Sequence, residues 1–129
     1  METDRRTPFS DEELDEFRAL IQAKRDAAMA DIDAARAQLT DSQQADNDST
    51  YSFHMADAGT DAAGRESLYQ SIGRLQAFVG HLDRALGRIE NKTYGVCRIT
   101  GEPIPKERLR AVPHTETTVA AKLGEQRKR

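Results

Sequence analysis

Apolar residues recur at alternating steps of four and three along two long stretches of the chain, a spacing typical of helices that bury one narrow face. In the first stretch the repeating positions lie between residues 14 and 39, but Arg18 and Arg25 occupy two of them. In the second stretch every repeating position is apolar, which is the pattern of a coiled-coil seam. The members of this second stripe are Leu68, Ile72, Leu75, Val79, Leu82, Leu86 and Ile89.

The beginning of the first helix carries two local signals. Ser10 and Glu13 have the spacing of a capping box, in which each side chain accepts a hydrogen bond from the other residue's backbone N–H. Phe9 and Leu14 have the spacing of a hydrophobic staple across that cap. We therefore predict a helix over about residues 11–39.

The second helix is predicted over about residues 61–90, with Thr60 as a candidate N-cap. The polar segment at about residues 40–60 has no periodicity and is interpreted as the connection at the tip of the pair. Two long helices joined by one connection are expected to pair as an antiparallel hairpin.

Three glycines, Gly73, Gly80 and Gly87, follow one another at intervals of seven along the second helix. Each lowers helix propensity by about 1 kcal/mol relative to alanine. The stripe indicates either close approach of another element along this edge or an unconstrained solvated face.

The sequence beyond residue 91 changes character, with glycines and prolines separated by β-branched residues. We predict a short β-hairpin that turns at Thr100–Gly101 or just after, with a second strand kept short by Pro103 and Pro105. A short terminal helix is expected at about residues 116–123.

The expected fold class is mostly α: an antiparallel two-helix coiled-coil hairpin over residues 1–92 and a small C-terminal module over residues 93–129. Hydrophobic residues make up 37% and aromatic residues 5% of the chain, too few for a large enzyme core with a deep pocket. No phosphate-binding glycine loop, nucleophile elbow or zinc-protease motif is present. We expect a protein that is not an enzyme.

The net charge of −3 argues against a general nucleic-acid binder. Cys97 is the single cysteine, which excludes an intramolecular disulfide and is typical of a reducing compartment. No stretch resembles a signal peptide or reaches the ~18 apolar residues of a membrane span. We expect a soluble cytoplasmic protein.

The segment YGVCRITGEPIPKERLRAVPHTETTVAAK, residues 94–122, resembles the C-terminal module of the DksA/TraR family of RNA polymerase-binding transcription regulators. In that family the module usually carries a zinc finger with four cysteines. Here the four ligand positions hold Cys97, Thr100, Thr118 and Ala121. The matching frame also includes Tyr94, Gly95, Gly101, Ile104, Arg108, Leu109, Ala111, Pro113 and Lys122.

One thiolate cannot supply the four ligands of a structural zinc site, so we expect neither zinc nor any other cofactor. A module without its metal must be held by packing instead. The apolar candidates for this packing are Ile99, Ile104, Leu109, Val112 and Val119.

The resemblance implies a mechanism in which the hairpin tip enters the secondary channel of RNA polymerase and alters initiation without binding DNA. Acidic tip residues of the family lie near the polymerase active site. The corresponding segment here contains Asp57, Thr60, Asp61 and Ala62. Such a regulator is expected to be a monomer.

Members of the family often act with guanosine tetraphosphate in the stringent response. Lys122 matches one basic position of the family, and Arg108 and His81 are further candidate contacts for the nucleotide or the polymerase. Val112 stands where an arginine is expected, so we predict a weak or absent response to the nucleotide.

Two alternatives remain open. The stripe from Leu68 to Ile89 could join several copies of the chain into an oligomeric structural or adaptor coiled coil. Cys97 could instead serve as a metal or redox sensor.

Overall fold

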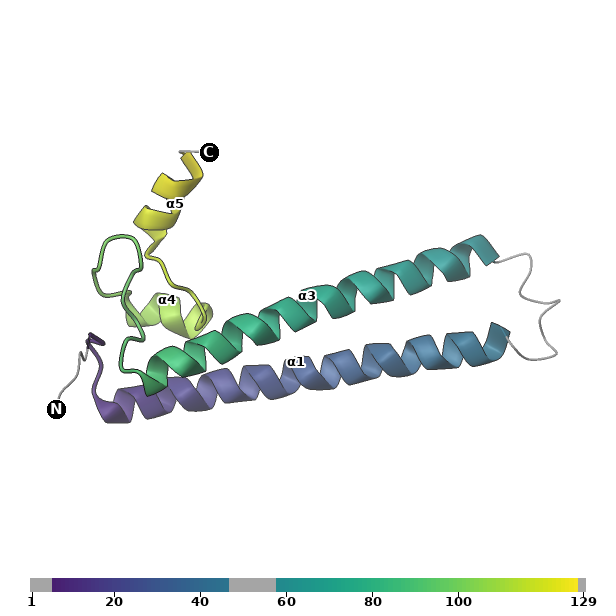
Figure 1. Ribbon diagram of the computed structural model, residues 1–129, viewed down its shortest axis with the longest axis horizontal. Coiled ribbons are helices and arrows are strands. Elements are labelled where there is room, and N and C mark those ends of the chain that lie inside the picture. The colour runs from purple at the N-terminus through teal and green to yellow at the C-terminus, as the bar shows by residue number, and fades with distance from the viewer. Residues whose placement is uncertain (1–5, 47–57, 128–129) are drawn as a thin grey trace. The chain divides into compact units, whose positions relative to one another are not determined.

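The computed structural model describes the backbone of residues 6–46 and 58–127, and the side chains of residues 6–41 and 62–125. The described residues form four helices: α1 (Asp11–Asp46), α3 (Ala58–Glu90), α4 (Lys106–Ala111) and α5 (Val119–Arg127) (Figure 1). They belong to two compact units. The terminal unit comprises Met1–Arg25 and Gly80–Arg129, and the central unit comprises Asp26–Val79.

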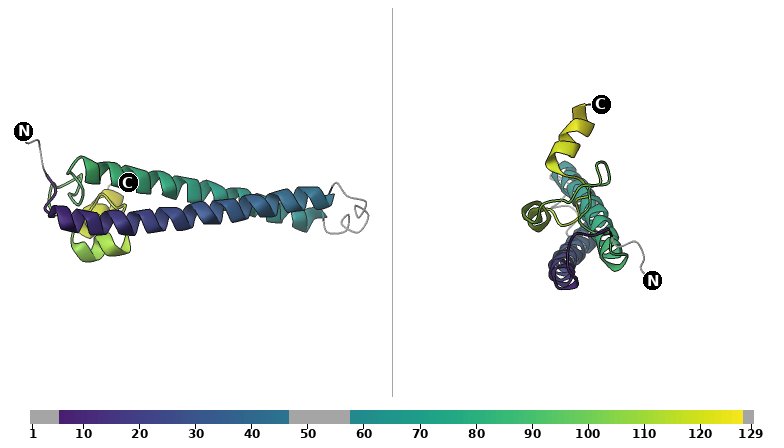
Figure 2. Two further views of the ribbon diagram at one scale, coloured as in Figure 1. Left: turned by 90° about the horizontal axis from the view of Figure 1, so that it is seen from below. Right: turned by 90° about the vertical axis from the view of Figure 1, so that its left-hand side faces the viewer.

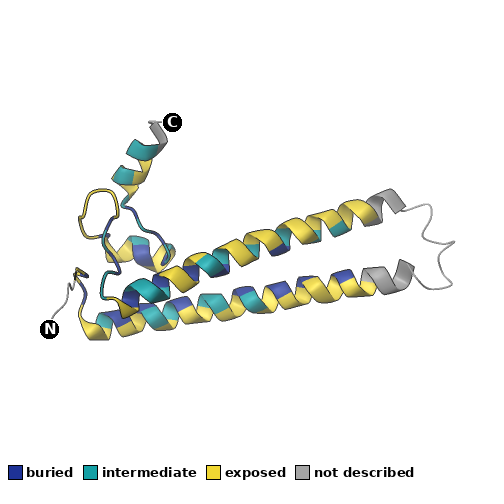
Figure 3. Cartoon of the chain, viewed as in Figure 1, coloured by how far each residue is buried: buried dark blue, intermediate teal, exposed yellow. Residues whose placement is uncertain are grey.

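The central unit consists of the second part of α1 packed antiparallel on the first part of α3, as two further views show (Figure 2). The facing sides of the two helices are buried and the outer sides are exposed (Figure 3). Both apolar stripes predicted from the sequence are therefore confirmed in this unit. Its core contains Ala28, Ile32, Ala35, Leu39, Ile72 and Val79, with Met29, Leu68, Leu75 and Phe78 packed partly buried against them.

The glycine stripe of α3 faces open space among the described residues. A Cβ atom added at Gly73 or Gly87 would meet nothing within 4 Å, and one at Gly80 would meet only an Arg84 nitrogen at 3.6 Å. Within the described part of the chain, no other helix or loop packs against this edge of α3.

The capping box at the start of α1 is confirmed. The backbone N–H of Ser10 donates to Glu13 Oε1 at 2.8 Å, and the N–H of Glu13 donates to Ser10 Oγ at 3.1 Å. Lys106 also hydrogen-bonds and ion-pairs with Glu13. The hydrogen bond from Lys106, followed by that from the Ser10 backbone, lowers the pKa of Glu13.

The two arginines that interrupt the first stripe bind acidic residues of α3. Arg18 Nη2 lies 3.2 Å from Glu90 Oε2, and Arg25 Nε donates to Asp83 Oδ1 at 2.6 Å. Both arginines are about one-third exposed, so the aliphatic stems cover the seam while the charged ends remain hydrated. In the terminal unit, the weak part of the stripe is thus completed by ion pairs.

The structure differs from the predicted helix ends near the connection. α1 extends to Asp46, past the end predicted near residue 39, and the Thr40 hydroxyl donates to the Arg36 carbonyl inside it. Residues 40–46 contain no glycine or proline, and their glutamines and alanine have good helix propensity. α3 begins at Ala58, so Thr60 lies within the helix and is not its N-cap.

The C-terminal segment holds less β-structure and more helix than predicted. Instead of two strands, the described residues contain a single antiparallel bridge between Val96 and Pro103. A second strand does not form because Pro103 and Pro105 lack the N–H groups of a ladder. The turn itself lies where it was expected, with Gly101 at φ 76°.

The two short helices of this segment also depart from the prediction. α4 was not expected; it begins after Pro105 and buries Leu109 completely. It ends at Ala111 because Val112 precedes a proline and cannot easily remain helical. α5 begins at Val119, three residues after the predicted start near residue 116.

None of the described helices is long and apolar enough to cross a lipid bilayer.

Candidate functional site

The segment from Cys97 to Glu102 forms a tight turn in the terminal unit. The Gly101 N–H donates to the Cys97 carbonyl at 2.9 Å, and the Cys97 N–H donates to the Glu102 carbonyl at 2.9 Å. At the base of the turn, the Ile104 N–H donates a hydrogen bond to the Gly95 carbonyl at 2.8 Å. These bonds fix the position of Cys97, whose side chain is only 1% exposed.

Three of the four predicted ligand positions, Cys97, Thr100 and Thr118, meet at the sulfur of Cys97. The thiol accepts hydrogen bonds from the Thr100 hydroxyl and from the backbone N–H groups of Thr100, Thr118 and Ile99. Burial would raise the pKa of the thiol, but these hydrogen bonds together lower it to about 6. We call this arrangement the Cys97 hydrogen-bond cluster.

The two threonines of the cluster have a second structural task each. Thr100 Oγ1 accepts the Glu102 N–H at 3.2 Å and so tightens the turn. Thr118 Oγ1 accepts the Ala121 N–H at 3.2 Å, which makes Thr118 the N-cap of α5. The two threonine hydroxyls are therefore committed to hydrogen bonds within the protein.

These residues do not fit a zinc ion. A closed structural site needs four thiolate or imidazole ligands, and here Cys97 is the single such ligand among the four positions. No group of three or more histidine, cysteine or acidic side chains suited to a metal occurs among the described residues. The contacts described at these positions are hydrogen bonds.

Only part of the predicted apolar set holds the module together. Ile104 and Leu109 are buried as expected, and Val112 is partly buried. Ile99 and Val119, however, are 46% and 54% exposed, because the turn and α5 direct them to solvent. Their predicted role in the core is wrong.

An aromatic cluster, not foreseen from the sequence, supplies the missing core. Phe9 and Tyr94 both pack on Phe17, with ring centroids 5.3 Å apart in each pair. The Tyr94 hydroxyl donates to the Pro113 carbonyl at 2.8 Å. Burial raises the pKa of Tyr94, so the hydroxyl stays protonated as this bond requires. A weak signal was available, since these are three of the seven aromatic residues in the chain.

Arg108, a candidate nucleotide contact, is engaged inside the module. Its Nε donates to the Thr117 carbonyl at 2.7 Å, and its Nη2 donates to Thr115 Oγ1 at 3.1 Å. Thr115 Oγ1 also accepts the Thr117 N–H at 3.3 Å. Arg108 thus orders the loop that leads to α5.

His81 and Lys122, the other two candidates, both lie near His114. The rings of His81 and His114 stack with centroids 5.5 Å apart, and Arg84 Nη2 lies 2.8 Å from His81 Nδ1. Burial and then the positive charges of His81, Arg88, Lys122 and Lys24 lower the pKa of His114. The structure therefore gathers basic side chains around His114. These residues lie far apart in the sequence, so the sequence alone did not reveal this group.

The predicted tip residues are described only in part. Asp57 lies outside the described residues, and Thr60 and Asp61 are described by backbone alone, within the first turn of α3. Ala62 is exposed. Their role at a tip stays a prediction.

Residues 92–127 match the model of a protein family described as prokaryotic dksA/traR C4-type zinc finger. The matched range contains the turn, the Cys97 hydrogen-bond cluster, α4 and α5. This segment of the chain is thus similar to the zinc-finger segment of the DksA/TraR family.

The chain is also similar in part to curated bacterial proteins. The chain is 43% identical over 70 residues to general stress protein 16O of Bacillus subtilis, covering 53% of this chain and 42% of that protein. It is 32% identical over 74 residues to the RNA polymerase-binding transcription factor DksA of Caulobacter vibrioides, covering 57% and 52%. The chain thus spans about half, or less, of the curated relatives it matches.

The fold also has a known counterpart. The structure of transcription factor DksA2 from Pseudomonas aeruginosa matches with a TM-score of 0.78, covering 89% of this chain and 84% of that one. The sequence identity is 24%, so this likeness concerns the fold. It confirms the expected fold class, a mostly helical protein with two long paired helices.

Proposed function

We propose that this protein regulates transcription by binding RNA polymerase, and that it is not an enzyme. The observation that carries the proposal is the match of residues 92–127 to the DksA/TraR family. The likeness to a DksA of Caulobacter vibrioides, whose name states polymerase binding, supports the same function.

We further propose that the connected ends of α1 and α3 enter the secondary channel of the polymerase. The central unit supports this role because it is only two helices thick, with one buried seam and exposed outer faces. Its helical segments of 21 and 22 residues are each about 30 Å long at 1.5 Å per residue. Such a pair is thin enough to enter a channel too narrow for a globular domain.

The charge of the chain is divided unequally between the two units. The central unit has nine acidic and three basic residues, a net charge of −6, whereas the terminal unit has a net charge of +3. An acidic pair of helices is attracted to a channel that leads to bound metal and basic side chains, and this attraction would speed its entry. The tip segment with Asp57, Thr60, Asp61 and Ala62 is proposed to act closest to the polymerase active site.

Direct promoter binding is not part of the proposed mechanism, because the net charge of −3 is unfavourable for binding to phosphate backbones. The protein would act as a monomer in the cytoplasm, where the polymerase is found. The packing of the second stripe against α1 within one chain supports the monomer over the oligomeric alternative.

The response to guanosine tetraphosphate is proposed to be weak or absent. Val112 supplies no charge, and Arg108 already binds Thr115 and Thr117. Lys122 and His81 remain as candidate contacts. Loss of charge-assisted hydrogen bonds to phosphate weakens such a site strongly.

The decisive experiment compares two double variants of equal charge in polymerase binding and in transcription from a purified system. Asp57→Ala with Asp61→Ala removes two charges at the tip. Asp33→Ala with Asp41→Ala removes two exposed charges along α1. We expect both variants to bind the core enzyme, and only the tip variant to lose its effect on initiation.

Two outcomes would contradict the proposal: no binding of the native chain at micromolar concentration, or equal loss of effect in both variants. The channel location is tested by an iron chelate attached at Ala62→Cys, which should cleave polymerase subunits near the active site. The same chelate at Ala37→Cys, an exposed position within α1, should cleave only farther out. The native Cys97 is buried and should react slowly.

A further inference from the structure

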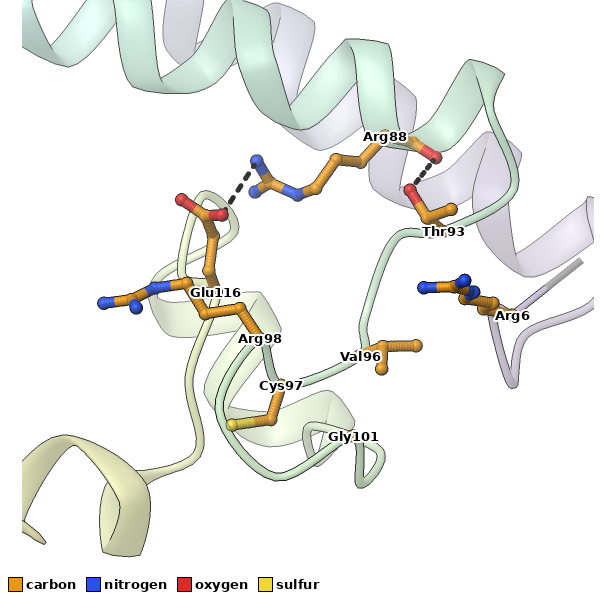
Figure 4. Close-up of a pocket in the computed structure, with 8 residues that line it drawn as sticks. All are labelled: Arg6, Arg88, Thr93, Val96, Cys97, Arg98, Gly101 and Glu116. Carbon is orange, nitrogen blue, oxygen red and sulfur yellow. Dashed lines mark hydrogen bonds and ion pairs between the residues drawn. The ribbon is translucent and has the colours of Figure 1, made fainter. Parts of the chain in front are cut away.

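A pocket of about 400 Å³ lies in the terminal unit and plays no part in the function proposed above. Its walls come from three segments: the start of the chain, the end of α3 with the loop after it, and the segment before α5 (Figure 4). Three arginines line it, Arg6, Arg88 and Arg98, together with one acidic residue, Glu116. This is an accumulation of positive charge in a chain whose net charge is negative.

One of the three arginines is neutralised outside the pocket. Arg98 Nη2 lies 3.2 Å from both carboxylate oxygens of Glu125. Figure 4 shows its side chain directed away from Arg6. The charge balance of the pocket therefore rests on Arg6 and Arg88 against Glu116.

Arg88 is a partly buried cation with loose pairing. Its side chain is 21% exposed, and burial lowers its pKa. Its Nη2 donates to the His114 carbonyl at 3.2 Å, but the nearest Glu116 oxygen lies 3.8 Å from Nη1, beyond hydrogen-bond distance. A guanidinium has five N–H donors, and removing it from water without close acceptors is unfavourable.

Arg6 lies across the pocket from Arg88 because hydrogen bonds hold its backbone at that position. The N–H groups of Arg6 and Thr7 both donate to the Lys92 carbonyl at 2.9 Å. Figure 4 shows the Arg6 side chain reaching toward the space between the two arginines. These backbone hydrogen bonds fix Arg6 without using its guanidinium, which faces the pocket.

We propose that this pocket binds a small, doubly charged phosphate group between Arg6 and Arg88. Guanidinium groups match phosphate oxygens in geometry and form short, charge-assisted hydrogen bonds with them. The volume lies at the lower end of the ~300–1,000 Å³ range typical of ligand pockets, which leaves room for a small group attached to the phosphate. Free phosphate and a phosphate monoester are the two sources of this chemistry. The inference is independent of polymerase binding.

The test is a titration of the full-length, isotope-labelled chain followed by NMR at constant ionic strength. Inorganic phosphate and methyl phosphate are the probes, and sodium chloride is the baseline. Saturable shifts are expected for the Arg88 Nε–H and for the backbone amides of Thr93 and Arg98. Tighter binding of methyl phosphate identifies a monoester site, and equal or weaker binding identifies a free-phosphate site.

Three variants distinguish the pocket from general charge. Arg6→Ala should weaken binding by about tenfold, the effect of losing one charge-assisted hydrogen bond. Arg88→Lys keeps the charge but loses the two-pronged geometry, and a similar weakening is expected. Arg110→Ala removes an exposed arginine of α4 and should leave the affinity unchanged.

Shifts that grow linearly without saturation would overturn the proposal. Equal affinity of the Arg6→Ala variant and the native chain would do the same. Arg6→Ala is expected to fold normally because alanine keeps the N–H that binds Lys92. The backbone spectrum of the variant verifies this.

Discussion

The Tyr94 hydroxyl donates a hydrogen bond to the Pro113 carbonyl at 2.8 Å in the fully buried interior of the terminal unit. This bond joins two segments 19 residues apart, one in the loop after α3 and the other after α4. It belongs to the same module as Cys97. We expect buried hydrogen bonds of this kind to contribute to the stability of this module.

Tyr94→Phe is expected to destabilise the protein by about 1–3 kcal/mol, because the buried Pro113 carbonyl loses its donor while the ring packing remains. Urea unfolding followed by circular dichroism measures the change. Tyr69→Phe is the matched control, since Tyr69 is 53% exposed and its variant should unfold like the native protein. An unchanged midpoint for Tyr94→Phe would mean that the bond contributes nothing to stability.

The glycines of α3 and Gly95, which precedes the turn, should respond to alanine in opposite directions. Gly73→Ala and Gly87→Ala should each stabilise the protein by up to about 1 kcal/mol, because the added methyl group meets nothing and helix propensity improves. Gly95→Ala should destabilise it strongly. Gly95 has φ 84°, and its Cβ would lie 2.3 Å from a ring carbon of Phe9. Thermal unfolding of the three variants is the measurement, and destabilisation by Gly73→Ala would reveal a partner on that edge.

The purified protein should contain no stoichiometric zinc, and a strong chelator should leave its melting temperature unchanged. The reason is that Cys97 alone offers a thiolate, and its sulfur is already hydrogen-bonded. Metal analysis by mass spectrometry gives the stoichiometry. One zinc ion per chain would disprove this reading.

Restoring the family ligands provides the complementary test. Thr100→Cys, Thr118→Cys and Ala121→Cys together recreate four thiols at the matching positions. This triple variant is expected to bind one zinc ion and to become sensitive to the chelator. Serine at the same three positions is the control, and it should bind no zinc.

Stability should fall as the pH decreases below about 6.5. Burial and the neighbouring charges of His81 and Arg88 lower the pKa of His114 below its ordinary value of 6.5. The unfolded chain therefore takes up a proton at a higher pH than the folded chain, and the contribution of His114 to folding is complete only above that value. His114→Gln should flatten the dependence of the urea midpoint on pH between 5 and 7.5. His81→Gln, which removes one neighbouring charge, should flatten it less.

The sequence by itself determined the long helices and their seam. The step pattern from Leu68 to Ile89 and the capping box at Ser10 are local, and the structure follows both. The family resemblance could also be recognised from the sequence, because the residues that match the family model lie within one continuous segment, residues 92–127. The sequence also shows that its single cysteine cannot supply four thiolate ligands.

Only the tertiary structure decided what holds the C-terminal module together. The aromatic contacts of Phe17 with Phe9 and Tyr94, and the stacking of His81 on His114, join segments far apart along the chain. Such contacts leave no periodic pattern in the local sequence. Their energy comes from burial, which exists only once α3 and the following loops are packed. Local propensity therefore assigned Ile99 to the core, although the closed turn at Gly101 directs it to solvent.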